Sequence, residues 1–117
     1  MAARRKFTNI VLRKTLDELR KTKSPFWKRV YELLSRPARE RVVVNVSKIN
    51  RYANDGDVVV VPGKVLGAGD IEKKVTVAAF SFSYTAVEKI TQAGGKVMHI
   101  SELVKENPKG KGLKIII

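Results

Sequence analysis

Side chains that can bind phosphate are the most chemically informative residues in this chain of 117 amino acids. All nine arginines lie between Arg4 and Arg51. The first 51 residues hold 15 lysines and arginines against four acidic residues, whereas the rest of the chain holds nine lysines against seven acids. Arginine presents a planar fork of donors that can bind two phosphate oxygens, and lysine acts as a point charge. The asymmetry therefore predicts binding to a polyanion, mostly through the first half of the chain.

Pairing within helices is expected to neutralise part of this charge. Asp17 lies four residues from both Arg13 and Lys21, and Glu18 and Glu32 also have cations at this spacing. Side chains four residues apart are neighbours on a helix, so these residues can form ion pairs. A charged helix face is usually exposed to solvent and binds no ligand. The cations left over are the predicted polyanion contacts: Arg4, Arg5, Lys6, Arg36, Arg39, Arg41, Lys48 and Arg51.

Two glycine-containing segments add candidate contacts in the second half. Residues 63–69 include Lys64, but they lack both the Gly-Lys-Ser/Thr of a P-loop and the last glycine of a dinucleotide fingerprint. A turn is the favoured interpretation, and a small-molecule enzyme that binds nucleotide with this loop is the less favoured alternative. Residues 107–112 are predicted to form a flexible basic loop that offers Lys109 and Lys111 to a phosphate backbone.

Residues suited to catalysis or metal binding are scarce. The chain has no cysteine and one histidine, His99, which lies in an apolar stretch. Zinc ligands, thiol nucleophiles and disulfides are therefore missing. Asp55 and Asp57 flank a turn glycine, and Ser81 and Ser83 have no local base. The sequence predicts a protein that is not an enzyme and needs no metal or cofactor.

The location of the protein is predicted from its apolar segments. No apolar run approaches the ~18 residues of a membrane span. The first nine residues, MAARRKFTN, are basic but are not followed by the apolar region of a secretory signal. We therefore expect no membrane partner. The lack of cysteine fits a reducing cytosol, and the scarcity of catalytic residues predicts no small-molecule substrate, so we expect a cytoplasmic protein.

The elements that position these residues are predicted to begin with two helices. A basic arm covers residues 1–6, and Thr8 or Asn9 can cap a helix that runs to about residue 21. Ser24 and Pro25 signal the start of a second helix, which Pro37 ends. Trp27 and Tyr31 are expected to pack in the core rather than to stack on bases, for which Tyr52 is the better candidate.

Short strands and helices are predicted to alternate after residue 37. Pro62 and Gly63 are expected to break one strand, and Ser47, Ser83 and Ser101 to cap helices. The expected strands cover residues 41–46, 58–61, 75–82, 96–100 and 113–117, and the expected helices cover residues 47–52, 84–93 and 102–107. This order predicts an α/β protein, as a compact superhelix of strand and helix units or as a flat parallel sheet. We expect one domain overall, with the basic arm and two helices in residues 1–37 and a compact α/β body in residues 38–117.

Several of these segments resemble the archaeal and eukaryotic ribosomal protein L18e family. The similar segments are LLSRPARERVVVNVSKINR at 33–51, GDVVVVPGKVLGAG at 56–69, VTVAAFSFS at 75–83, AGG at 93–95 and NPKG at 107–110. The resemblance covers nearly the whole chain in order. The short length is similar to that of the archaeal members.

The resemblance implies a structural protein of the large ribosomal subunit that binds large-subunit ribosomal RNA beside neighbouring ribosomal proteins and supports translation. It also implies the fold shared with the L15 family, an irregular superhelix of β-β-α units, here preceded by a basic N-terminal helical extension. The matching cations are Arg36, Arg39, Arg41, Lys48 and Arg51. RNA contacts of the other candidates are predicted from charge. A free-standing architectural protein that binds nucleic acid remains an alternative.

Overall fold

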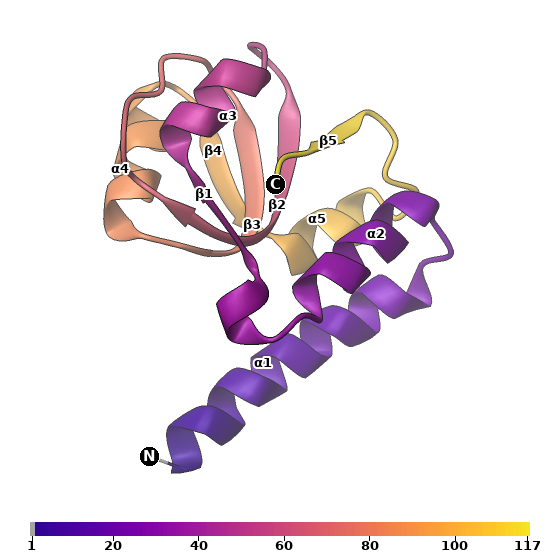
Figure 1. Ribbon diagram of the computed structural model, residues 1–117. Helices are drawn as coiled ribbons and strands as arrows, with labels where there is room; N and C mark the ends of the chain where they lie inside the picture. Colours follow the sequence, from indigo (N-terminus) through magenta and orange to yellow (C-terminus); the bar gives the residue numbers. More distant parts are fainter. Residues whose placement is uncertain (1) are drawn as a thin grey trace.

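The computed structural model describes the backbone of residues 2–117 and the side chains from Val11 onward. Five strands form one sheet, with helices on both of its faces (Figure 1). In chain order the elements are α1 (Ala2–Lys21), α2 (Pro25–Leu34), the 3-10 helix η1 (Ala38–Glu40), β1 (Val42–Asn45), α3 (Val46–Tyr52), β2 (Val58–Leu66), β3 (Thr76–Phe82), α4 (Tyr84–Gln92), β4 (Lys96–His99), α5 (Ile100–Glu106) and β5 (Leu113–Ile115).

Every strand pair in this sheet is parallel, so the predicted α/β class is confirmed. The strand order is β1-β2-β3-β4, and β5 pairs with β2 as well. Because β3 occupies one edge of β2, the other edge is shared: Val58–Val60 pair with β5 and Gly63–Leu66 pair with β1. This division of one strand edge makes the sheet irregular.

The predicted strand break at Pro62 and Gly63 is wrong, because β2 continues through both residues to Leu66. The register of β2 against β3 shifts between Val61 and Lys64, which accommodates a proline that cannot donate to the ladder. Gly63 allows β1 to come close, since a Cβ atom there would lie 1.9 Å from the carbonyl oxygen of Val42. The residues that read as a break therefore form a tight β1–β2 contact.

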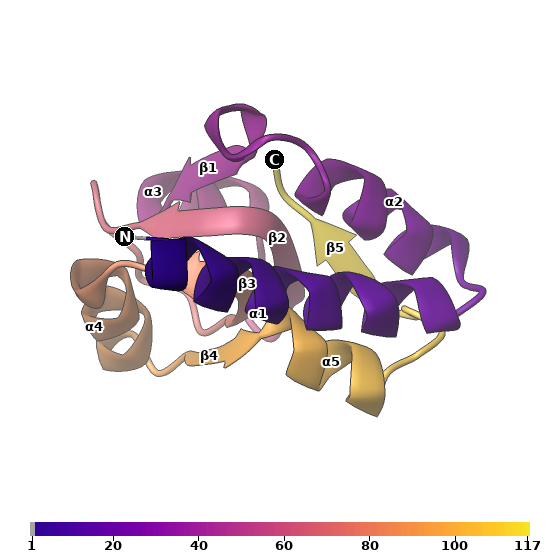
Figure 2. The same cartoon turned by 90° about the horizontal axis from the view of Figure 1, so that it is seen from below.

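Helix α1 begins at Ala2 rather than at Thr8 or Asn9, so the prediction of a separate arm over residues 1–6 is wrong. Alanine, arginine and lysine are good helix formers and extend the helix toward the N-terminus. The side chains of Arg4, Arg5 and Lys6 lie outside the described residues. Seen from below, α1 crosses the molecule with α2 on one side and α5 on the other (Figure 2).

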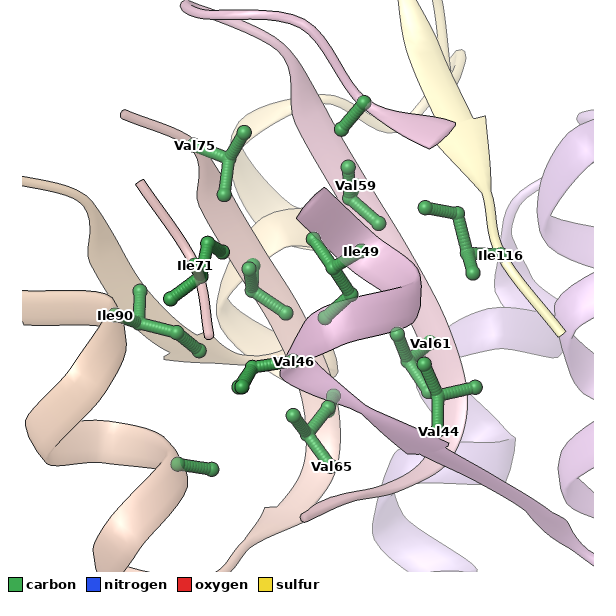
Figure 3. Packing of buried hydrophobic residues seen from close by; sticks show 14 residues of the cluster. Val44, Val46, Ile49, Val59, Val61, Val65, Ile71, Val75, Ile90 and Ile116 are labelled. Atoms are coloured by element: carbon green, nitrogen blue, oxygen red, sulfur yellow. The ribbon is translucent and has the colours of Figure 1, made fainter. Parts of the chain in front are cut away.

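Two apolar layers hold the helices to the sheet. The first lies under α3 and α4, where Val46 and Ile49 of α3 pack with β2 residues such as Val59 (Figure 3). The second lies on the opposite face and joins β2 and β3 to α1, α2 and α5. Leu19 of α1 belongs to it, and Leu12 and Leu16, which recur at helical spacing, pack against it. The division of the chain at residues 37 and 38 stays a prediction.

Trp27 confirms the expected core role, because its side chain is fully buried in the second layer. Its Nε1 atom donates a hydrogen bond of 2.7 Å to the carbonyl oxygen of Asn107. Tyr31 is half-buried and packs against the same layer. An indole that is both buried and hydrogen-bonded ties α2 to the loop before β5.

The short helices begin at different residues than predicted in two of three cases. Ser83 caps α4 as expected, accepting a hydrogen bond from the amide of Ala86. Helix α3 begins at Val46, so Ser47 lies inside it. Helix α5 begins at Ile100, and the cap is His99, whose Nδ1 accepts from the amide of Ser101 at 3.1 Å.

Candidate nucleic-acid interface

Helix α2 places cationic residues at both of its ends. Pro25 occupies its first turn, where a missing N–H costs nothing. Ser24 does not cap the helix with its side chain, but its Oγ donates to the carbonyl oxygen of Lys109 at 2.8 Å. Arg36 follows the opposite end. Because ten helical residues span about 15 Å, Lys109 and Arg36 belong to separate parts of the surface.

Arg36 and Arg39 form the core of the candidate interface beyond the C-terminal end of α2. Both side chains are exposed. Within the side chains that the structure describes, no carboxylate lies within ion-pair distance of either guanidinium. Both arginines are therefore available to an external anion.

Arg41 differs from these neighbours because it has a contact within the protein. Its Nε atom donates to the carbonyl oxygens of Leu34 at 3.1 Å and of Arg36 at 3.0 Å. These carbonyls lie at the end of α2, where helix carbonyls lack intrahelical partners and favour a cation. Arg41 thus closes α2 and fixes the path into β1, a role that the sequence did not predict.

An exposed row of side chains extends the interface across the sheet. Val43 pairs in register with Lys64, which pairs with Ser81. Their neighbours Val44 and Val65 are buried under α3 and α4, so the row faces the opposite side of the sheet. All three members are exposed, and Val43 is 58% exposed. The structure therefore gives Lys64 an open position on a strand instead of in a loop.

Lys48 and Arg51 lie on α3, on the other face of the sheet, so the predicted cations do not form one patch. Both are exposed, and Lys48 Nζ donates to the carbonyl oxygen of Ile117 at 2.6 Å. Tyr52 ends the same helix and is 56% exposed. These residues form a second, smaller basic group.

The loop at residues 67–69 is built around a lysine of the protein itself. Lys89 Nζ donates to the carbonyl oxygens of Gly67 at 2.8 Å and of Gly69 at 2.5 Å. The amide of Ala68 donates to Asn45 Oδ1. A phosphate cradle needs free backbone amides that point at the anion. Here the carbonyls bind the ammonium group of Lys89, and the amide of Ala68 donates to Asn45. The nucleotide-enzyme alternative therefore loses its proposed site.

The loop at residues 107–112 is organised by the side chain of Asn107. Its Oδ1 atom accepts from the amides of Gly110 at 3.0 Å and Lys111 at 3.3 Å. Its Nδ2 atom donates to the carbonyl oxygen of Lys111 at 2.9 Å. Lys109 and Lys111 are both exposed. The predicted flexible loop therefore has internal hydrogen bonds that fix its path.

The acidic residues of α1 and α2 pair with other partners than predicted. The observed ion pairs are Asp17 with Arg20 at 3.3 Å, Glu32 with Arg29 at 3.7 Å, and Glu18 with Lys105 at 3.5 Å. Two of the pairs are three residues apart, and the third crosses from α1 to α5. These contacts neutralise Arg20, Arg29 and Lys105, and leave Arg36 unpaired within the described part of the chain.

The perturbed titratable groups have structural partners. Burial lowers the pKa of His99, which favours the neutral ring that caps α5. The amide of Asn54 and the ammonium group of Lys114 lower the pKa of Asp57, which fastens the turn before β2 to β5. Among the residues described, no cluster of three acidic or histidine side chains could hold a metal ion. No helix over residues 2–117 is long and apolar enough to cross a membrane.

Comparison with known proteins decides the family. The family described as ribosomal protein 60S L18 and 50S L18e matches residues 4–116. This chain belongs to that family. It is 53% identical to the large ribosomal subunit protein eL18 of Methanococcus maripaludis, over 91% of this chain and 88% of the relative. The eL18 proteins of Sulfurisphaera tokodaii and Archaeoglobus fulgidus are 48% and 54% identical, over 99% and 87% of this chain and 98% and 87% of the relatives.

Membership in the L18e family confirms the resemblance seen in the sequence segments. The relatives are ribosomal proteins by name, which agrees with the prediction that this chain is not an enzyme. Their names give no residue roles. The exposed cations described above therefore remain a candidate interface.

Proposed function

We propose that this protein is a structural constituent of the large subunit of cytoplasmic ribosomes, where it binds and stabilises folded large-subunit ribosomal RNA and supports translation. The proposed RNA interface is supported mainly by the exposure of three cations, Arg36, Arg39 and Lys64. None of them has a carboxylate partner among the described side chains. They lie where β1 and β2 meet the end of α2. Neighbouring ribosomal proteins are the other expected partners.

The mechanism is electrostatic and architectural. Folded RNA brings phosphates close together, and cations held on a rigid surface lower their mutual repulsion. The row of Val43, Lys64 and Ser81 lies on strands of the sheet, and side chains cannot read the deep, narrow major groove of an RNA helix. Shape and contacts to phosphates and 2′-hydroxyl groups should therefore dominate over base reading.

Sedimentation tests the ribosomal assignment. An epitope-tagged chain expressed in an archaeal host should migrate with large subunits in sucrose gradients run after a high-salt wash. Migration of the tagged chain with free RNA or DNA, and its loss from washed subunits, would favour the free-standing architectural alternative. A tagged resident large-subunit protein in the same gradient controls for subunit recovery.

Salt dependence tests the interface. Affinity for a large-subunit RNA fragment should fall with salt less steeply after Arg36→Ala and Arg39→Ala, by about 0.7–0.9 in the logarithmic slope for each lost phosphate contact. Lys74→Ala with Lys96→Ala removes the same charge near the start of β3 and β4, and should leave the slope nearly unchanged. Equal changes in both pairs would mean that only net charge matters.

A further inference from the structure

The turn that joins α1 to α2 is bordered by two adjoining grooves that the sequence did not predict. One lies against Tyr31 and has a volume of about 310 Å³. The other lies against Pro108 and Lys109 and has a volume of about 460 Å³. Both are lined by the turn residues Thr22, Lys23 and Ser24. Volumes of this size are typical of pockets for small molecules or for one nucleotide.

The charge around these grooves is positive. Their linings include Arg20, Lys23, Lys28 and Lys109, and no carboxylate. Arg20 pairs with Asp17, which leaves three lysines to attract an anion among the described residues. The hydrogen bond from Ser24 to the carbonyl of Lys109 holds the two sides of the second groove together. The lysines are thus arranged around a fixed backbone.

An aromatic platform lies in the first groove. The guanidinium carbon of Arg20 is 5.8 Å from the centre of the Tyr31 ring, in cation–π contact. Unpaired bases stack on aromatic rings and on arginine planes. Tyr31 is half-buried, so its ring is fixed by the core while part of it lines the groove.

The two hydroxyl groups in the turn are set to accept hydrogen bonds. Thr22 Oγ1 donates its proton to the carbonyl oxygen of Leu19 at 3.0 Å, and Ser24 Oγ donates to that of Lys109. Each hydroxyl proton is therefore in use, and each oxygen has only lone pairs to offer a ligand. A ribose 2′-hydroxyl can donate to such an oxygen, whereas deoxyribose cannot.

We propose that the α1–α2 turn is a separate binding site for one unpaired nucleotide of single-stranded RNA. The base stacks against the Tyr31 and Arg20 platform, the flanking phosphates contact Lys23 and Lys28, and the ribose 2′-hydroxyl donates to the turn. This proposal rests on the proposed function in that the ligand is RNA. The turn lies about one α2 length from Arg36, and the site extends from the turn along α2 to Tyr31. This site binds an unpaired nucleotide instead of a folded surface.

Binding of short oligonucleotides tests the site. Fluorescence anisotropy with a labelled six-nucleotide oligouridine should show tighter binding than with the oligodeoxyuridine of equal length. Lys23→Ala with Lys28→Ala should lower the salt slope by about 1.4, for two contacts to a single strand. Tyr31→Leu should weaken binding about tenfold, and Tyr31→Phe should retain it because the ring remains. Lys74→Ala with Lys96→Ala is the charge-matched control.

The opposite results are equally clear. Equal affinity for RNA and DNA, or a control pair that loses as much binding as the lysine pair, would overturn the proposal. So would equal affinity for an acidic peptide such as oligoglutamate, which would indicate a protein partner. If oligouridine binding is unaffected by these variants while the chain still migrates with large subunits, only this site is refuted. If the wild-type chain fails to migrate with large subunits, the proposed function is refuted, whatever the groove binds.

Discussion

Replacing Arg41 with alanine separates folding from RNA binding within one basic segment. The Arg41 side chain is half-buried, and its Nε–H is shared between the carbonyl oxygens of Leu34 and Arg36. Arg39, two residues away, is exposed and has no such contact with the residues whose side chains are described. Arg41→Ala should therefore lower the free energy of unfolding, whereas Arg39→Ala should mainly weaken RNA binding.

The magnitude follows from counting one shared hydrogen bond. Hydrogen bonds that involve a charged group contribute about 1.5–3 kcal/mol. Because Arg41 is partly exposed and one N–H serves two carbonyls, we expect a loss of about 1.5 kcal/mol. For a domain of this size the midpoint of thermal unfolding should fall by about 6 °C. Arg39→Ala should change the free energy of unfolding by less than about 0.5 kcal/mol, as for surface positions in general.

Urea unfolding followed by circular dichroism measures the first quantity, and RNA titrations at several salt concentrations measure the second. The urea m-value should stay constant in both variants, since the same surface is exposed on unfolding. If Arg41→Ala is as stable as Arg39→Ala, the capping role assigned to Arg41 is refuted. If Arg39→Ala leaves the salt slope at its wild-type value, Arg39 does not contact phosphate.

Three further predictions concern the fold. Gly63→Ala should cost about 3 kcal/mol or more in urea unfolding, because its Cβ would overlap the carbonyl oxygen of Val42; a change below about 0.5 kcal/mol would contradict the close β1–β2 contact. Trp27→Phe should cost about 2 kcal/mol by removing the donor to Asn107, and unchanged stability would mean that water replaces it. The pKa of His99 is lowered in the folded state, so its contribution to stability is complete above about pH 6.5 and is lost as the pH falls. His99→Asn keeps a cap acceptor without titrating, so the unfolding free energy of this variant should fall less than that of the wild type between pH 7 and pH 5. If the unfolding free energies of the two proteins change in parallel with pH, His99 is not the source of the pH dependence.

Local patterns predicted most of the elements and their order. Ser24 with Pro25, and Ser83 before an apolar helical stripe, are signals that act within one turn of chain, and both helices begin there. The signals that failed depend on contacts elsewhere. Pro62 and Gly63 read as a break because they usually are one, but the approach of β1 and a register shift in β2 keep them in the sheet.

The candidate site was predicted less completely than the fold. Residue type alone identified Arg36, Arg39 and Lys64 as cations, and the structure leaves all three exposed. Residue type could not show that Arg41 and Arg39 have different roles. The carbonyls of Leu34 and Arg36 become available to Arg41 only because α2 ends at Leu34. The groove beside Tyr31 also had no sequence signal, since its lining comes from two helices.

The sequence by itself determined the charge asymmetry, the helix and strand order and membership in the L18e family. The charge asymmetry depends on composition, the element order depends mostly on neighbours within a few residues, and the family match depends on the order of residues along residues 4–116. The tertiary structure alone decided which cations remain open. Lys89 is taken up by the loop at residues 67–69, and Lys48 and Lys64 lie on opposite faces of the sheet. Such outcomes depend on which distant segments the chain brings together, because a side chain stays available to RNA only if no other part of the protein has already bound it.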